Sequence, residues 1–273
     1  MIEILSTLFS YSFMNRALIA GTLVSLCAAL LGVSLVLKRY SMIGDGLSHV
    51  GFGALSVSTA LNWAPMGVAL PVVLLSAFLL LRLNAHGRVS SDAAIALVSS
   101  SSLAIGIIAT SLAGGIGTDL YNYMFGSVLA MSRTDVTLAL CLSVVVLILF
   151  VFFYQKIFAV TFDEVFAKAT GLKSELYTML IAALTAITIV IGMRLMGTLL
   201  ISSLIIFPAL SAMRISRSFL GVTVGAAVLS VVCFWVGVLA SFLLSTPTGA
   251  SVVLVDLAVF LLLSLYGLLR RRK

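Results

Sequence analysis

Charge is what this sequence lacks most. Only 9% of the residues are charged and 62% are hydrophobic, with a mean hydropathy of +1.27, whereas a soluble domain has about 25% charged residues. A globule of this length buries only about three quarters of the surface of its chain. Most of these apolar side chains therefore need lipid as their solvent, and the composition predicts an integral membrane protein.

Groups that could perform catalysis are equally scarce. The chain has nine acidic residues and two histidines. It contains no GxxxxGK[ST] phosphate loop, so it cannot bind ATP in the P-loop manner, and any energy from ATP must come from another subunit. HExxH and GxSxG motifs are also missing, which leaves an intramembrane hydrolase without a visible nucleophile and base. The sequence does not predict an enzyme.

Cysteine is rare, and its three copies are isolated. Cys27, Cys141 and Cys233 lie in apolar stretches without CxxC spacing, which argues against a disulfide framework or a thiolate zinc site. The net charge of +7 comes from basic residues at the ends of apolar runs. That pattern sets orientation in a bilayer and does not indicate a nucleic-acid partner.

Long apolar runs make up most of the chain. A helix needs about 20 residues to cross the hydrocarbon core, and continuous runs favour helices over the alternating strands of a membrane barrel. We therefore predict an all-α polytopic membrane protein, with residues 1–273 as a single transmembrane domain. Nine crossings are expected, or eight, because only Met193 and Arg194 separate two of the runs. The runs cover residues 17–37, 43–62, 66–82, 93–113, 134–154, 175–193, 195–213, 219–244 and 250–269.

The basic residues predict the orientation of these crossings. With nine crossings, one orientation places thirteen basic residues on the cytoplasmic side and three outside. Because cytoplasmic loops are enriched in lysine and arginine, we expect the N-terminus outside and the C-terminus inside. The cytoplasmic set is Lys38, Arg39, Arg82, Arg88, Lys156, Lys168, Lys173, Arg214, Arg217, Arg270, Arg271, Arg272 and Lys273, and the outer set is Arg16, Arg133 and Arg194.

Two shorter segments fit neither a span nor a plain loop. Residues 119–131, DLYNYMFGSVLAM, are too short to cross and are expected to form a re-entrant or interfacial helix on the outer side. Residues 162–171, FDEVFAKATG, place apolar side chains at helical spacing with charged residues on other faces. They predict a short amphipathic cytoplasmic helix, which either lies on the membrane surface or docks on a partner.

Asp45 and His49 are the most informative polar residues. An ionised side chain at the centre of a membrane helix costs about 2.5–3.5 kcal/mol, and a spacing of four residues places both on one helix face. A carboxylate with an imidazole suits zinc, manganese or iron(II) better than copper(I). Two ligands form an incomplete shell, which suits a transport site that must release its ion. The alternative is that Asp45 caps the helix or pairs with Lys38 or Arg39, while His49 only packs.

Three other residues are weaker candidates. Asp256, in the ninth run, either lines the outer mouth of a pathway or hydrogen-bonds a neighbouring helix. Asp119 is a further candidate for the pathway. Pro208 should kink the seventh run and free a carbonyl group, which makes it either a hinge or a static bend.

Five segments, in order, resemble one known family. KRYSMIGDGLSHVGFGALS is similar to the GDALSHA signature of the permease subunits of bacterial ABC importers for zinc, manganese and iron(II), the ABC-3 family. GTLLISSLIIFPALSAMRISRS resembles the family's GALLVSALLIIPAATAR helix, and TPTGASVVL its TPAGPTIVL turn. DLYNYMFGSVLAMS and FDEVFAKATG resemble its outer segment and its cytoplasmic helix. Gly46 replaces the usual alanine or threonine, and Ser211 and Met213 interrupt the AATAR pattern.

The resemblance implies a multi-pass permease of the bacterial inner membrane. It implies a homodimer that binds two copies of a cytoplasmic ATPase and receives metal from an extracytoplasmic binding protein. Asp45 and His49 fall on the GDxLSH positions and become transient metal contacts. The cytoplasmic segment becomes the ATPase coupling helix, with Phe162, Asp163, Glu164, Phe166, Ala167 and Gly171 on the matching positions.

The function expected from these features is ATP-driven import of a divalent transition metal. Zinc is favoured over manganese or iron(II), and no permanently bound cofactor is expected. The alternative is a secondary transporter or channel that uses an ion gradient. Such transporters often contain inverted repeats, and we detect no convincing internal repeat here.

Overall fold

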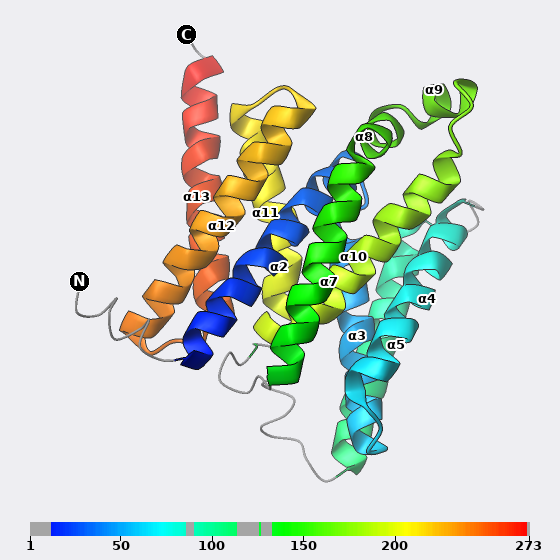
Figure 1. Ribbon diagram of the computed structural model, residues 1–273, viewed down its shortest axis with the longest axis vertical. Coiled ribbons are helices and arrows are strands. Elements are labelled where there is room, and N and C mark those ends of the chain that lie inside the picture. Colours follow the sequence, from blue (N-terminus) through cyan, green and yellow to red (C-terminus); the bar gives the residue numbers. More distant parts are fainter. Residues whose placement is uncertain (1–11, 86–89, 114–125, 127–132, 272–273) are drawn as a thin grey trace.

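The described part of the chain is almost entirely helical. The computed structural model describes residues 12–85, 90–113, 126 and 133–271, and eleven helices hold most of them (Figure 1). The all-α prediction is confirmed for these residues. The helices are α2 (Ser12–Leu37), α3 (Ile43–Ala60), α4 (Pro65–Ala85), α5 (Ser91–Leu112), α7 (Arg133–Phe152), α8 (Tyr154–Phe162), α9 (Glu164–Ala169), α10 (Ser174–Met196), α11 (Thr198–Ile215), α12 (Phe219–Leu244) and α13 (Thr248–Arg271).

Each of the nine predicted runs coincides largely with one long helix, but not every helix has the character of a span. Six described helices are long and apolar enough to cross a membrane, and the bent pair α7 and α8 makes a seventh. α11 contributes only the shorter apolar stretch Leu200–Ile215, and α3 carries Asp45 and His49. Length and composition thus identify six or seven spans in the described part of the chain, fewer than the predicted nine.

The helices form one bundle with two distinct ends. Figure 1 shows α2 starting at the end opposite to that where α13 finishes, whereas α8 and α9 lie at the same end as the last turns of α13. We call this the α9 end. A direct contact between Lys38, which follows α2, and Glu164 of α9 fixes the last turn of α2 there as well.

The boundary between α10 and α11 lies later than predicted. The break was expected at Met193 and Arg194, but both residues belong to α10, and the backbone breaks at Gly197 with φ 86° and ψ 163°. Essentially only glycine adopts that conformation. Hydropathy places the boundary between the two helices at the charged Arg194, whereas the helix ends at Gly197, where a glycine permits the required backbone conformation. The two helices are nevertheless separate. The predicted topology requires this, because merging them would break its alternation of cytoplasmic and outer loops.

The segment after α7 also differs from the prediction. α7 and α8 meet at an angle of 69°, and the predicted helix at 162–171 is shorter than expected. Phe162 ends α8, and Asp163 is the N-cap of α9, which ends at Ala169. The Asp163 carboxylate accepts a hydrogen bond from the Phe166 amide at 2.9 Å and so caps the start of α9. Residues 162–171 are therefore divided between the end of α8 and the new helix α9, instead of forming one helix.

α3 lies in the interior of the bundle. It packs against α4, α5, α10 and α11. Glycines allow the close approach to α5, because a Cβ atom at Gly53 would lie 2.5 Å from the Ser102 carbonyl oxygen and one at Gly46 would lie 2.7 Å from Ile95. This packing holds the face of α3 that carries Asp45 and His49.

Candidate functional site

Asp45 and His49 face one another on α3. Asp45 lies in the first turn of the helix, and its Oδ2 is 3.7 Å from Nε2 of His49 one turn later. The side chains are 38% and 19% exposed, respectively. The predicted spacing on one face is confirmed, and the pair is neither sealed in the core nor fully open.

A hydroxyl group from α11 completes the near surroundings of the carboxylate. Ser202 Oγ donates to Oδ1 of Asp45 at 3.4 Å, and it also lies 3.2 Å from the Thr198 carbonyl oxygen within its own helix. Ser48 Oγ donates to the backbone carbonyl of Asp45 at 2.7 Å and lies 3.5 Å from Ser202 Oγ. The site thus joins α3 to the first turns of α11.

The structural alternatives for Asp45 do not match its contacts. The N-cap of α3 is Met42, and no side chain caps the helix start. Among the ion pairs of the described residues, Asp45 pairs with His49, while Lys38 pairs with Glu164 at 3.2 Å. Asp45 is thus neither a cap nor the partner of Lys38, and its second oxygen faces the imidazole.

The geometry of the pair suits contact with a cation. Two ligands that are each about 2.1 Å from a tetrahedral zinc ion lie about 3.4 Å apart, close to the observed 3.7 Å between Oδ2 and Nε2. Within the described residues, no group of three or more histidine, cysteine, aspartate or glutamate side chains could hold a metal. The described part of one chain therefore offers two strong ligands and the weaker Ser202 hydroxyl.

Asp256 occupies a different environment. It is 2% exposed on α13, and its carboxyl group is hydrogen-bonded to the thiol of Cys233 on α12. Its Oδ2 atom has no hydrogen-bond partner among the described residues. These surroundings resemble the helix-packing alternative more than the mouth of a pathway.

The remaining candidates are placed only in part. Asp119 lies outside the described residues, as does the outer segment 119–131 apart from Gly126. Gly126 has φ 75°, and a Cβ atom there would clash with the backbone at Met196 and Gly197. Pro208 is inside α11, which continues through it from Thr198 to Ile215. The hinge role of Pro208 therefore stays a prediction.

The last residue of α8 and the short helix α9 expose large apolar side chains. Phe162, Val165 and Phe166 are 69%, 79% and 66% exposed, whereas Ala167 is buried. Gly171 ends this segment with φ 84° and nothing within 4 Å of a Cβ built there. The amphipathic pattern predicted for residues 162–171 is therefore present, and its larger apolar groups point away from the bundle.

Glu164 fixes α9 to the bundle. Its carboxylate contacts Lys168 Nζ at 3.1 Å and Lys38 Nζ at 3.2 Å. Partial burial alone would raise the pKa of Glu164, but the hydrogen bonds and charges of Lys168 and Lys38 outweigh it and lower this pKa below its ordinary value. The carboxylate is therefore ionised throughout the physiological pH range.

Two residues of these sites were missed in the sequence. Ser202 lies in the apolar stretch LLISSLII, where the two adjacent hydroxyl residues were the available signal. Lys38 was counted only as a charge at the end of a run, and its pairing with a residue 126 positions away leaves no local pattern.

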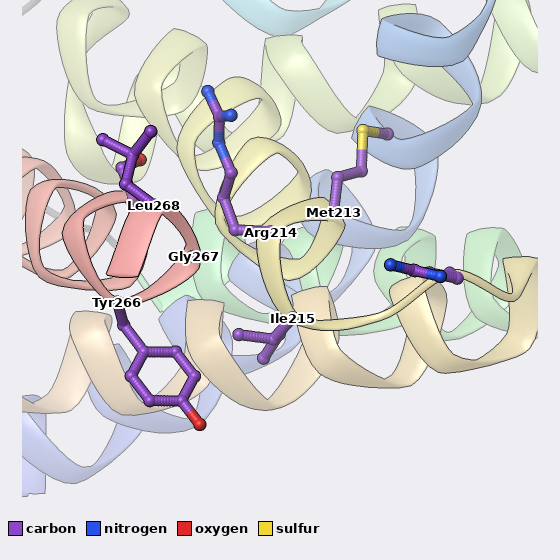
Figure 2. Close-up of a pocket in the computed structure, with 8 residues that line it drawn as sticks. Met213, Arg214, Ile215, Tyr266, Gly267 and Leu268 are labelled. Atoms are coloured by element: carbon purple, nitrogen blue, oxygen red, sulfur yellow. The ribbon is translucent and has the colours of Figure 1, made fainter. Parts of the chain in front are cut away.

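A cavity of about 760 Å³ lies elsewhere, where α11 and α13 end (Figure 2). Its lining includes Arg214, Arg217, Tyr266 and Gly267, and Arg214 lies 5.7 Å from the centre of the Phe260 ring. Two guanidinium groups repel a dication, and the described residues of the lining include no carboxylate or imidazole. Despite its size, this cavity does not suit a metal, and the Asp45 and His49 pair remains the candidate site.

Comparisons with known proteins agree on one family. The ABC 3 transport family matches residues 10–267 of the chain. The manganese transport system membrane protein MntC of Halalkalibacterium halodurans is 28% identical over 93% of this chain and 87% of its own length. The high-affinity zinc uptake system membrane protein ZnuB of Haemophilus influenzae is 29% identical over 92% of this chain and 97% of its own.

A solved structure supports the same fold. A chain of PsaBC from Streptococcus pneumoniae, in complex with a Fab, superposes with a TM-score of 0.86 and 29% identity, covering 96% of this chain and 95% of its own. The likeness extends over nearly the whole length of both chains.

Proposed function

Because the chain belongs to the ABC 3 transport family, we propose that it is the membrane permease of an ATP-dependent importer for a divalent transition metal. It is a multi-pass protein of the bacterial cytoplasmic membrane and provides the path, while a separate subunit hydrolyses ATP. The observation that carries the metal proposal is the partly exposed pair of Asp45 and His49, 3.7 Å apart on one face of α3. A buried, sealed pair could not exchange an ion.

Zinc is the metal that we favour, with manganese(II) and iron(II) as the other members of the same class. Carboxylate and imidazole ligands suit all three, and the relatives include proteins named for manganese and for zinc. A low number of ligands fits transient binding, because a structural zinc site normally has four. A second copy of the chain, with its pair near a shared two-fold axis, would raise the number of strong ligands to four.

The partners follow from the exposed chemistry. We propose that residues 162–171, which include α9, are the coupling segment and insert Phe162, Val165 and Phe166 into a groove of the ATPase, with one ATPase copy for each permease copy. The apolar side chains already face outward, so docking can bury them without any local unfolding of the permease. An extracytoplasmic metal-binding protein delivers the ion at the opposite end of the bundle.

For the topology we propose nine crossings in one transmembrane domain, with the N-terminus outside and the C-terminus in the cytoplasm. α3 is then a span whose polar residues are tolerated because neighbouring helices surround them, and α11 is a span with a shorter apolar stretch. The α9 end carries Lys38, Lys156, Lys168 and Lys173 on or beside described helices, in agreement with a cytoplasmic location.

The direct test is uptake of radioactive zinc into proteoliposomes that contain the permease and its ATPase, with metal-loaded binding protein outside. We expect accumulation that requires ATP on the ATPase side and stops when a non-hydrolysable analogue replaces it. Competition by unlabelled manganese and iron(II) then ranks the metals.

The rival function, a gradient-driven transporter or channel, predicts a different result in the same vesicles. Permease reconstituted without ATPase would take up metal when a proton or ion gradient is imposed. Such uptake, unaffected by ATP, would overturn the proposal.

A further inference from the structure

Lys38 is an unusually buried lysine that touches three helices. Its side chain is 7% exposed, and its Nζ lies 3.2 Å from each of three acceptors. These are the Val160 carbonyl oxygen of α8, Glu164 Oε2 of α9 and Thr178 Oγ1 of α10. An ammonium group has three hydrogens to donate, so every donor of Lys38 is used. One side chain from the end of α2 therefore joins the helices around the docking segment.

On α9, Glu164 makes several polar contacts, as Lys38 does after α2. Besides Lys38, it binds Lys168 of its own helix at 3.1 Å and accepts a hydrogen bond from Ser174 Oγ at 3.4 Å. A rotation or translation of α9 therefore acts on Lys38 through a charge-assisted hydrogen bond of 3.2 Å. Exposed ion pairs usually contribute little, but the Lys38 side chain is only 7% exposed and its ammonium group has three acceptors within the protein.

The chain that follows Lys38 leads directly to the metal site. The Tyr40 amide donates to the Leu35 carbonyl at 2.8 Å and the Arg39 amide to the Val36 carbonyl at 3.1 Å, the two bonds of a Schellman motif. Arg39 has φ 61°, a left-handed conformation in which glycine is the usual residue. The Ile43 amide then bonds the Tyr40 carbonyl at 3.0 Å, and α3 begins.

This turn is short, and the amides of Arg39, Tyr40 and Ile43 in it are hydrogen-bonded, so it transmits displacement more than it absorbs it. Asp45 lies in the first turn of α3, seven positions after Lys38. We infer that Lys38 is a positioning residue that links α9 to the metal contacts, so that movement of α9 on the ATPase shifts Asp45 and His49 relative to Ser202. This inference rests on the proposed function and adds to it the residue through which ATP hydrolysis acts on the metal site.

Lys156 provides a matched control. It also lies at the α9 end, and its ammonium group is 5.9 Å from the centre of the Phe153 ring and 5.4 Å from that of Tyr177. It therefore connects α8 to α10, as Lys38 does, but within the described part of the chain it makes no hydrogen bond, ion pair or ring contact with α2 or the turn before α3. Loss of its charge removes a cation near α9 without breaking the link.

The experiment compares Lys38→Met, Lys38→Arg, Glu164→Gln and Lys156→Met in proteoliposomes that contain the whole transporter. Three quantities are measured: zinc transported per ATP hydrolysed, stimulation of ATP hydrolysis by zinc-loaded binding protein, and the thermal unfolding temperature. For Lys38→Met we expect transport per ATP to fall about tenfold, a usual size for coupling between two sites, with loss of the stimulation. Glu164→Gln should show a smaller fall, and Lys38→Arg should restore most of the coupling. Lys156→Met should match the unchanged protein.

The outcomes separate this inference from the proposed function. If the unchanged protein accumulates zinc with ATP and Lys38→Met transports as much per ATP, the inference is wrong while the proposed function stands. A parallel fall of transport, ATP hydrolysis and unfolding temperature in both Lys38→Met and Lys38→Arg would mean that Lys38 only maintains the fold, which also overturns the inference. If the unchanged protein accumulates no zinc with ATP, the proposed function itself fails.

Discussion

Two carboxylates inside the bundle, Asp45 on α3 and Asp256 on α13, have opposite surroundings. The Asp45 side chain is 38% exposed, and its two oxygens face His49 and Ser202. Asp256 is 2% exposed, contacts Cys233, and has an oxygen without a partner among the described residues. Both residues are costly in a membrane, so rarity alone does not distinguish them. Their solvent access distinguishes them. A carboxylate that exchanges an ion must be accessible, whereas one that packs two helices together can be fully buried.

The neighbouring helices explain this difference. α3 is covered by four other helices, so a polar face on it can border an internal path without contacting lipid. α13 packs mainly against α11 and α12 among the described helices, and most of its surface is exposed in the single chain. The carboxyl group of Asp256 on α13 avoids that surface by turning inward, where it contacts the Cys233 thiol.

The largest effect should follow removal of either ligand of the pair. Asp45→Ala and His49→Ala each leave one strong ligand in the chain, and zinc uptake by the reconstituted transporter should fall by about a hundredfold or more, since even residues that merely support ligands often cost 10- to 100-fold. The thermal unfolding temperature and the binding of ATPase should stay unchanged. Uptake near the original level in both variants would remove the pair from the mechanism.

A second prediction extends the comparison to exposed apolar groups. Phe166 is 66% exposed on α9, and an aromatic residue that anchors an interface contributes about 2 kcal/mol or more. Phe166→Ala should therefore weaken ATPase binding about thirtyfold, measured by titrating ATPase onto permease in lipid nanodiscs. Thr170→Ala, an exposed change just after the same helix, is the control. Equal binding by both variants would argue against α9 as the docking surface.

A smaller effect should follow removal of the hydroxyl group that α11 contributes to the site. Ser202→Ala removes the hydrogen bond to Asp45 Oδ1 and leaves both strong ligands in place. Such a bond contributes about 1 kcal/mol, so the concentration of zinc-loaded binding protein needed for half-maximal uptake should rise about fivefold. Ser203→Ala, whose hydroxyl bonds only the Leu200 carbonyl at 2.8 Å within α11, should leave it unchanged. The reverse order would exclude Ser202 from the site.

Much of this arrangement could be predicted from the sequence, because hydropathy and helical spacing are local. The long helices and the one-turn separation of Asp45 and His49 depend only on these patterns. The break at Gly197 was misplaced because hydropathy responds to Arg194, not to backbone freedom. The 69° bend after α7 occurs in VFFYQ, without a glycine or proline to indicate it.

The contacts that complete the sites could not be predicted, because they join distant parts of the chain. Ser202 meets Asp45 across 157 positions and Lys38 meets Glu164 across 126. Each of these residues has an ordinary local role, as a hydroxyl inside a helix or a charge at a helix end. Only the packing of α11 on α3 and of α9 on the end of α2 gives them a second partner.

The most direct test of the central claim makes the same chemical change at both carboxylates. Asp45→Asn and Asp256→Asn each remove one negative charge and keep the size of the side chain, and ATP-dependent zinc uptake is measured in identical proteoliposomes. The account predicts that Asp45→Asn loses nearly all uptake while Asp256→Asn keeps at least about half, because a sealed carboxyl group takes no part in ion exchange. Loss of uptake in Asp256→Asn together with normal uptake in Asp45→Asn would contradict it.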